Sequence, residues 1–219
     1  MRIGLFGGTY NPIHIGHLRA AEEVYEGFSL DKIYLIPSSL PPHKDISRVI
    51  EAKYRLEMIK LAISGIENFV VSNVEIDRGG QSYTIDTINY FKSTLPQNAE
   101  LFLIIGIDAF LEINTWKAYK DFFSIIPFIV VSRPSPNDKI LKPKLLENYL
   151  HSVISNRYKF FSDEASFKHN ELQSIFMFNI TDLDISSTKI RNLIKSKKSI
   201  RFLVNEKVNN FILEKRLYL

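Results

Sequence analysis

Two histidines stand three residues apart near the start of the chain, in the stretch GGTYNPIHIGHL at residues 7–18. The stretch follows a short apolar run, so a strand is predicted to end here and a helix to begin near the histidines. His14 and His17 then share one face of the first helical turn, where free backbone N–H groups and the positive end of the helix dipole attract anions. The pattern predicts a phosphate-binding site.

The small residues around the histidines favour the same interpretation. Gly7 and Gly8 permit a positive φ and let a ligand approach the backbone closely, and Thr9 adds a hydroxyl group. Gly16 keeps the space between the two imidazoles open. Two alternatives stay open at this point: a turn followed by two surface histidines, or a zinc site, for which no nearby cysteine or acidic residue completes the ligand set.

A second cluster, ISSTKIR at residues 185–191, places hydroxyl groups at a predicted helix start. Ser186, Ser187 and Thr188 are suitable N-cap residues, and Arg191 lies one turn further on. Alone, the pattern is typical of a capped surface helix. Together with the histidine stretch, it predicts a second loop that binds the same polyphosphate.

Short apolar runs alternate with helical patterns along the chain. Several runs are apolar throughout, which is typical of parallel strands buried on both faces. The alternation predicts an α/β fold, a doubly wound Rossmann-like parallel sheet with helices on both faces and ligands at the carboxyl ends of its strands. The predicted strands are residues 3–6, 32–37, 69–76, 100–106, 128–132 and 175–180.

The later part of the chain has a less regular pattern. Residues 134–174 contain one predicted helix at 145–154 and are otherwise unassigned. Two further helices are predicted, one from about residue 187 and one at 206–215. Because no linker-like composition intervenes, residues 1–219 are expected to form a single domain with a C-terminal helical portion from about residue 185.

Composition excludes several functional classes. The chain is 45% hydrophobic and 24% charged, which is ordinary for a globular protein, and it contains no cysteine for disulfides or thiol catalysis. No apolar run approaches the roughly 20 residues of a membrane span, and no signal-peptide pattern opens the chain, so a cytoplasmic location is expected. The net charge of +4 suits a polyphosphate ligand as well as a nucleic acid.

The two clusters are similar to a known pair of motifs. GGTYNPIHIGH resembles the (G/S)xxxPxHxGH signature of the nucleotidylyltransferase superfamily, and ISSTKIR resembles its ISSTxIR partner, in the expected order. Tyr10 and Asn11 stand where the superfamily commonly has Phe and Asp. The resemblance implies a triphosphate site for ATP formed by Gly7, Gly8, Thr9, His14, Gly16, His17, Ile185, Ser186, Ser187, Thr188 and Arg191.

Three further segments, PPHK, SYTIDT and IGIDAFLEINTWK, resemble the bacterial nicotinate mononucleotide adenylyltransferases within that superfamily, as does the C-terminal VNEKVNNFILEKRLY. The resemblance covers nearly the whole chain and weakens only at residues 134–174. It implies transfer of the adenylyl group of ATP to nicotinate mononucleotide, with release of pyrophosphate, in NAD biosynthesis.

Each segment also has a physical interpretation. Gly106 and Asp108 are assigned to ATP. Asp108 is predicted to end the buried strand after Gly106, where its carboxylate accepts both hydroxyls of a ribose, or else it caps the following helix. Trp116 is the only tryptophan, and its stacking on the nicotinate ring rests on the resemblance, since a lone tryptophan more often packs in a core. Tyr83 and Thr84 begin a helix whose free N–H groups suit the nicotinate carboxylate.

Charge determines the expected chemistry. ATP and the mononucleotide are both anions, so cations must bring them together: Mg²⁺ delivered with ATP, then His14, His17, Lys44, Arg191 and Arg133. His17 is assigned to the α-phosphate in the transition state and His14 to the bridging and β-phosphate region, with Arg191 as a third catalytic residue. Lys44 and Arg133 are assigned to the mononucleotide.

Two other functions stay open. A phosphopantetheine adenylyltransferase or a cytidylyltransferase would share both phosphate motifs but lack PPHK, SYTIDT and the tryptophan segment. A nucleic-acid-binding protein is suggested by the basic run at residues 189–201, which carries no alternating aromatic residues for base stacking. No nucleic-acid or membrane partner is therefore expected, and a homo-oligomer is left open.

Overall fold

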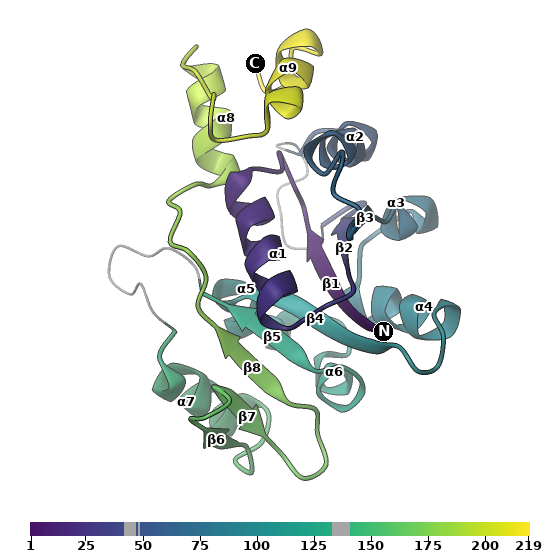
Figure 1. The fold of residues 1–219 in the computed structure, drawn as a ribbon, viewed down its shortest axis with the longest axis vertical. Coiled ribbons are helices and arrows are strands. Elements are labelled where there is room, and N and C mark those ends of the chain that lie inside the picture. Colours follow the sequence, from purple (N-terminus) through teal and green to yellow (C-terminus); the bar gives the residue numbers. More distant parts are fainter. Residues whose placement is uncertain (42–46, 48, 133–140) are drawn as a thin grey trace.

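The computed structural model describes residues 1–41, 47, 49–132 and 141–219. Within them, one eight-stranded sheet has the strand order β3-β2-β1-β4-β5-β8-β7-β6 (Figure 1). Its first six strands in this order pair in parallel. They are β3 (Phe69–Val71), β2 (Lys32–Pro37), β1 (Arg2–Gly8), β4 (Glu100–Gly106), β5 (Phe128–Val131) and β8 (Ile175–Phe178).

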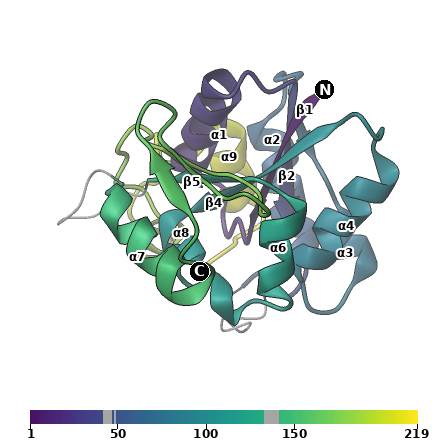
Figure 2. The same cartoon turned by 90° about the horizontal axis from the view of Figure 1, so that it is seen from below.

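The apolar strands bury both of their faces, as their composition predicts. Along β4, Phe102 and Ile104 join one core cluster while Leu103 and Ile105 join the other, because successive side chains point to opposite faces of a sheet. Figure 2 shows helices on both sides of the sheet. The doubly wound α/β fold is therefore confirmed.

Different helices cover the two faces. The first core cluster includes buried residues of α1 (Ile15–Gly27), α2 (Ala52–Ala62), α8 (Ser187–Lys195) and α9 (Glu206–Glu214). The second includes residues of α4 (Thr84–Thr94), α5 (Ile107–Leu111), the 3₁₀ helix η2 (Ile113–Thr115), α6 (Tyr119–Ile125) and α7 (Pro143–Val153).

The chain reverses its direction of winding between β1 and β4. From β1 it proceeds to β2 and β3 on one side, and it then returns to lay down β4 and β5 on the other. The register pairs Phe6 of β1 with Ile104 of β4. In an open parallel sheet the crevice outside the carboxyl ends of two such strands is where ligands bind.

The strand predicted at residues 69–76 is too long. The structure ends β3 at Val71 and forms a short helix, α3 (Val74–Arg78). The backbone N–H of Ser72 still donates to the Leu35 carbonyl (3.0 Å), but the chain then turns away. Glu75, the polar residue of VEI, is the buried residue of this helix.

Residues 134–174 contain more structure than the sequence predicts. Besides α7, they form a hairpin of β6 (Lys159–Phe161) and β7 (Ser166–Lys168), which extends the sheet in antiparallel fashion beyond β8. These strands have three residues each, so their pattern is too short to be recognised. The sheet is therefore mixed at this edge rather than parallel throughout.

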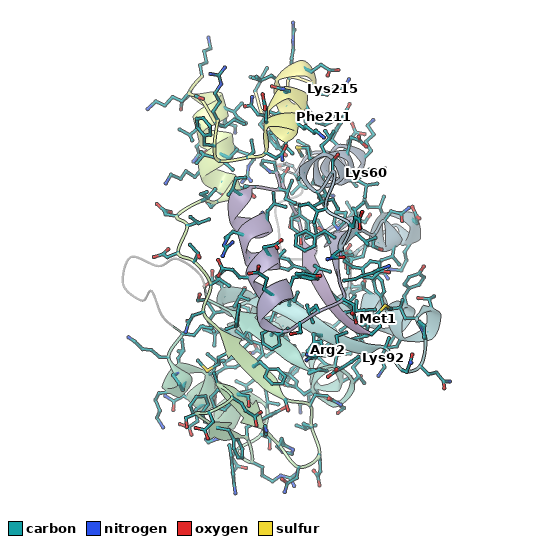
Figure 3. The ribbon with its side chains drawn as sticks, in the orientation of Figure 1. Met1, Arg2, Lys60, Lys92, Phe211 and Lys215 are labelled. Atoms are coloured by element: carbon teal, nitrogen blue, oxygen red, sulfur yellow. The ribbon has the colours of Figure 1, made fainter. Side chains whose placement is uncertain are left out.

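The C-terminal helices pack against the N-terminal half of the chain. The Phe211 ring of α9 lies 6.3 Å from the Tyr54 ring of α2, and Figure 3 shows Phe211 near Lys60 of α2. The Leu203 carbonyl accepts a hydrogen bond (2.9 Å) from the N–H of Ile15, the first residue of α1. The single-domain organisation of residues 1–219 stays a prediction. Among the described residues, every helix is too short or too polar to cross a membrane.

Candidate active site

Two cavities meet at the carboxyl ends of β1 and β4. One, of about 650 Å³, is lined by both histidines and by residues of the ISSTKIR motif, and we term it the histidine cavity. The other, of about 300 Å³, is lined by Trp116 and the start of α4, and we term it the tryptophan cavity. Both are lined by Phe6, Gly7, Gly8, Thr9 and Gly106.

The two histidines lie together at the start of α1. His14 is the N-cap residue and His17 is in the first turn, and their rings stack with centroids 3.7 Å apart. The backbone N–H of His14 donates to Nδ1 of His17 (3.3 Å). In the neutral imidazole, a Nδ1 that accepts a hydrogen bond leaves the proton on Nε2. The His17 ring is therefore oriented as a donor through Nε2.

A buried tyrosine supports the His17 ring. The Tyr10 and His17 rings meet edge to face with centroids 5.1 Å apart, and the Tyr10 hydroxyl donates to the Phe6 carbonyl (2.7 Å). Burial raises the pKa of the Tyr10 hydroxyl well above its usual value, so it stays protonated and keeps donating. Tyr10 therefore connects the His17 ring to the backbone of β1, through a ring contact on one side and a hydrogen bond on the other.

The positive φ that the sequence suggests at Gly7 and Gly8 is wrong. Strand β1 continues through Gly8 without a positive φ, and the left-handed residue is Tyr10, with φ of 48°. A Cβ on Gly8 would lie 3.0 Å from the Tyr10 ring, and one on Gly16 would lie 3.1 Å from Nδ1 of His14. Gly8 and Gly16 therefore make room for the Tyr10 and His14 rings.

The ISSTKIR motif contacts the histidine stretch through hydrogen bonds. Ser187 Oγ donates to the Pro12 carbonyl (2.8 Å), and Arg191 Nη1 donates to the Asn11 carbonyl (2.8 Å). Arg191 Nη2 also donates to the Thr188 hydroxyl (3.1 Å). The guanidinium has five N–H donors, so these bonds leave others for a ligand.

The predicted N-cap of α8 is confirmed. Ser186 is the N-cap residue, and its Oγ accepts a hydrogen bond from the N–H of Lys189 (3.2 Å). All of the predicted triphosphate-binding residues of this motif line the histidine cavity: Ile185, Ser186, Ser187, Thr188 and Arg191. Two stretches about 170 residues apart in sequence thus form one cavity wall.

The tryptophan cavity contains the predicted acceptor-binding residues that the structure describes. Tyr83 is the N-cap residue of α4 and Thr84 is its first residue, so the predicted helix start is confirmed. Trp116 is half-buried, and its ring meets Phe122 edge on, with centroids 6.1 Å apart. All three residues line the cavity.

One described site residue, Asp108, lines neither cavity. Asp108 is neither a strand end nor an N-cap: β4 ends at Gly106, and Asp108 is an exposed residue in the first turn of α5. Of the described residues, those that line the two cavities do not include it. Lys44 and Arg133 lie outside the described residues.

Sequence analysis missed a buried arginine behind both cavities. Arg55 of α2 is only 1% exposed and donates to three backbone carbonyls, those of Thr9 (2.9 Å), Ser39 (2.9 Å) and Ile50 (3.0 Å). Burial lowers the pKa of its guanidinium, which nevertheless stays charged because the reference value is so high. No local motif marks such a residue, because its partners are backbone atoms of distant segments.

A buried carboxylate also lines the tryptophan cavity. Glu75 of α3 accepts a hydrogen bond from the Thr87 hydroxyl of α4 (2.6 Å), and Arg78 donates to the same hydroxyl (3.1 Å). Nearby, the Ser39 N–H donates to Ser82 Oγ (2.7 Å). These bonds attach the start of α4 to α3 and to the loop after β2.

The chain is similar to known proteins over its full length. The cytidylyltransferase-like family matches residues 5–193. A protein of Desulfatibacillum aliphaticivorans named probable nicotinate-nucleotide adenylyltransferase is 43% identical over the full length of both chains. One of Pelobacter propionicus with the same name is 40% identical over 100% of this chain and 98% of the other.

Solved structures share the fold. The nicotinic acid mononucleotide adenylyltransferase of Plasmodium falciparum complexed with APC superposes with a TM-score of 0.72 at 17% identity, covering 99% of this chain and 96% of the other. The same protein complexed with NaAD gives a TM-score of 0.70 at 18% identity, covering 99% and 97%.

Proposed function

We propose that this chain, which belongs to the cytidylyltransferase-like family, transfers the adenylyl group of ATP to nicotinate mononucleotide. The products are nicotinate adenine dinucleotide and pyrophosphate, so the reaction is a step of NAD biosynthesis. One observation carries the proposal: the histidine stretch and the ISSTKIR motif are joined by Arg191 and Ser187 into one anion-binding wall, beside a second cavity lined by Trp116.

The triphosphate of ATP is assigned to the histidine cavity. Its described lining offers imidazole, hydroxyl, guanidinium and backbone N–H groups, which are the donors that phosphate oxygens accept from. The mononucleotide is assigned to the tryptophan cavity, with its phosphate toward the segment at Gly7 and Gly8 that lines both cavities. The acceptor phosphate and the α-phosphate of ATP then meet at the end of β1.

The reaction requires positioning more than proton transfer. An oxygen of the acceptor phosphate, already ionised at neutral pH, attacks the α-phosphorus of ATP; the new P–O bond forms as the bond to the bridging oxygen breaks and pyrophosphate leaves. His17 donates to the α-phosphate, His14 to the bridging and β-phosphate region, and Arg191 to the β- and γ-phosphates. These preorganised donors stabilise charge as it develops.

Mg²⁺ is proposed to enter with ATP as part of the substrate. No group of three or more histidine, cysteine or acidic side chains that could hold a metal occurs in the described part of the chain. The donors around the histidine cavity suit phosphate oxygens, whereas Mg²⁺ prefers oxygen ligands such as the phosphates themselves. Bound to ATP, the ion would neutralise charge on the triphosphate. Lys44 and Arg133 stay predictions, as does the cytoplasmic location, where ATP is supplied.

The proposal is tested by following pyrophosphate release from ATP and Mg²⁺ with nicotinate mononucleotide, its amide form and phosphopantetheine as acceptors in parallel reactions. Nicotinate mononucleotide is expected to support release, with nicotinate adenine dinucleotide as the second product by chromatography. Reactions without acceptor, and reactions with EDTA in excess over Mg²⁺, should release none. Faster release with phosphopantetheine than with nicotinate mononucleotide, or adenylylation of neither mononucleotide, would contradict the proposal.

A further inference from the structure

Lys117 is the one cation among the described residues that line the tryptophan cavity, and the reaction as proposed gives it no role. Its ammonium group lies 4.6 Å from the centroid of the Tyr83 ring and 3.3 Å from Oδ2 of Asp86. Tyr83 is the N-cap residue of α4, and Asp86 is in the first turn of that helix. The ammonium group therefore lies beside the N-terminus of α4.

The residue before Lys117 determines where a flat ligand ring can lie. The Trp116 backbone N–H donates to the Ile113 carbonyl (2.9 Å), and the indole packs edge on against the buried Phe122. The backbone hydrogen bond and the contact with Phe122 thus hold the indole at the cavity wall. Trp116 and Lys117 line the same cavity as Tyr83 and Thr84 at the start of α4.

The ion pair with Asp86 leaves Lys117 available to a ligand. Side chains of Lys117 and Asp86 are 51% and 38% exposed, and a pair so open to water contributes little to stability. Lysine carries its charge on a flexible four-carbon chain, so the ammonium group can move from Asp86 to a ligand carboxylate.

The acids of the cavity favour the same location for an anion. Glu75 and Glu112 also line the cavity. Each would repel a carboxylate placed beside it, and Glu75 already accepts a hydrogen bond from Thr87. The Lys117 side of the cavity is therefore where a negative substituent is most favourable.

We propose that Lys117 sets the preference of this site for the acid form of a pyridine mononucleotide over the amide form. The inference rests on the proposed function, because it assigns the base-binding end of the same acceptor cavity. A carboxylate beside Lys117 gains a charge-assisted hydrogen bond and the field of the α4 N-terminus. A carboxamide has no charge to offer, and its NH₂ donors face other N–H donors.

The test compares Lys117→Met, Lys117→Arg and the matched control Lys120→Met, a neighbouring exposed lysine of α6 that does not line either cavity. We expect Lys117→Met to lower kcat/KM for nicotinate mononucleotide roughly tenfold, mainly through KM, and to change kcat/KM for the amide by less than about twofold. Lys117→Arg keeps the charge and should keep the preference. Lys120→Met should leave kcat/KM for both mononucleotides unchanged. The KM for ATP should be unchanged in all three variants.

Binding is measured separately from turnover through the fluorescence of Trp116, the only tryptophan of the chain. Titration with each mononucleotide should show weaker binding of the acid alone in Lys117→Met. An unchanged ratio of acid to amide affinity, or an equal loss for both, would overturn the role of Lys117. Selective binding without any adenylyl transfer would instead overturn the proposed function and leave this inference standing.

Discussion

A single hydrogen bond decides which nitrogen of His17 can donate a hydrogen bond to a ligand. Since the His14 N–H occupies Nδ1, only Nε2 is directed as a donor, and the stacked His14 ring and the edge-on Tyr10 ring restrict the plane in which it lies. Arg191 is restrained in the same way by the Asn11 carbonyl and the Thr188 hydroxyl. Donors held this way need no reorganisation when charge develops, which is the basis of the catalytic role proposed for them.

Replacing His17 with alanine tests that arrangement. We expect His17→Ala to lower kcat by roughly 10²–10³-fold, because one preorganised donor to the α-phosphate is lost. Its thermal unfolding should match that of the wild type within a few degrees. The control is His151→Ala, an exposed histidine of α7, which should keep full activity. Near-wild-type turnover of His17→Ala would show that this ring has no direct part in the reaction.

At the level of elements, three backbone carbonyls outside the helices depend on one helix residue. Arg55 projects from α2 and binds carbonyls in the loop after β1, in the loop after β2 and just before α2 itself. The Ile50 N–H in turn donates to Asn11 Oδ1 (3.3 Å), so the same segment also contacts the histidine stretch. A buried guanidinium thus fixes the relative positions of segments that line both cavities.

Arg55→Met should therefore destabilise the protein strongly. The methionine fills part of the space but leaves three carbonyls without their donor, at a cost of roughly 3 kcal/mol or more. For a chain of this size the melting temperature should fall by about 6–12 °C. Arg157→Met removes only an exposed pair with Glu171 and should change stability little. Equal melting temperatures for the two variants would contradict the role of Arg55.

At the scale of the whole molecule, the sheet buries aromatic groups on both faces. Tyr10 lies in the core cluster beside α1, and Tyr158 lies in the cluster beside α7, where its hydroxyl donates to the Gln173 carbonyl (3.0 Å). Burial raises the pKa of both hydroxyls above the usual value. The folded state therefore favours the neutral, protonated form of Tyr10 on one face of the sheet and of Tyr158 on the other.

Stability should therefore fall in alkali. Unfolded tyrosines ionise near pH 10 while these two stay protonated when folded, so their contribution is complete below pH 10 and is lost as pH rises further, by about 1.4 kcal/mol per group per pH unit. Melting temperatures measured from pH 8 to 11 should show this decline. Tyr158→Phe should decline less steeply, whereas Tyr90→Phe, at an exposed tyrosine, should follow the wild type. Parallel curves for all three proteins would contradict the assignment.

The sequence by itself determined the chemistry and most of the fold. The motifs at residues 7–18 and 185–191 carry their own backbone signals, namely a strand end, a helix start and an N-cap at Ser186, and such signals are local. The mostly apolar runs at residues 3–6, 32–37 and 100–106 located β1, β2 and β4 for the same reason. The three-residue strands β6 and β7 carry too little pattern to be recognised.

Only the tertiary structure decided which distant groups meet. Nothing local shows that Arg191 binds the Asn11 carbonyl, that Arg55 binds three backbone carbonyls, or that Glu75 is buried rather than part of a strand. The Arg191–Asn11 and Arg55–Thr9 contacts join residues that are 180 and 46 positions apart in sequence. Lys117 likewise lies beside α4 through its contacts with Tyr83 and Asp86, from which β4 and α5 separate it along the chain. Residue types and spacing specify the parts of this site, and long-range packing specifies their arrangement.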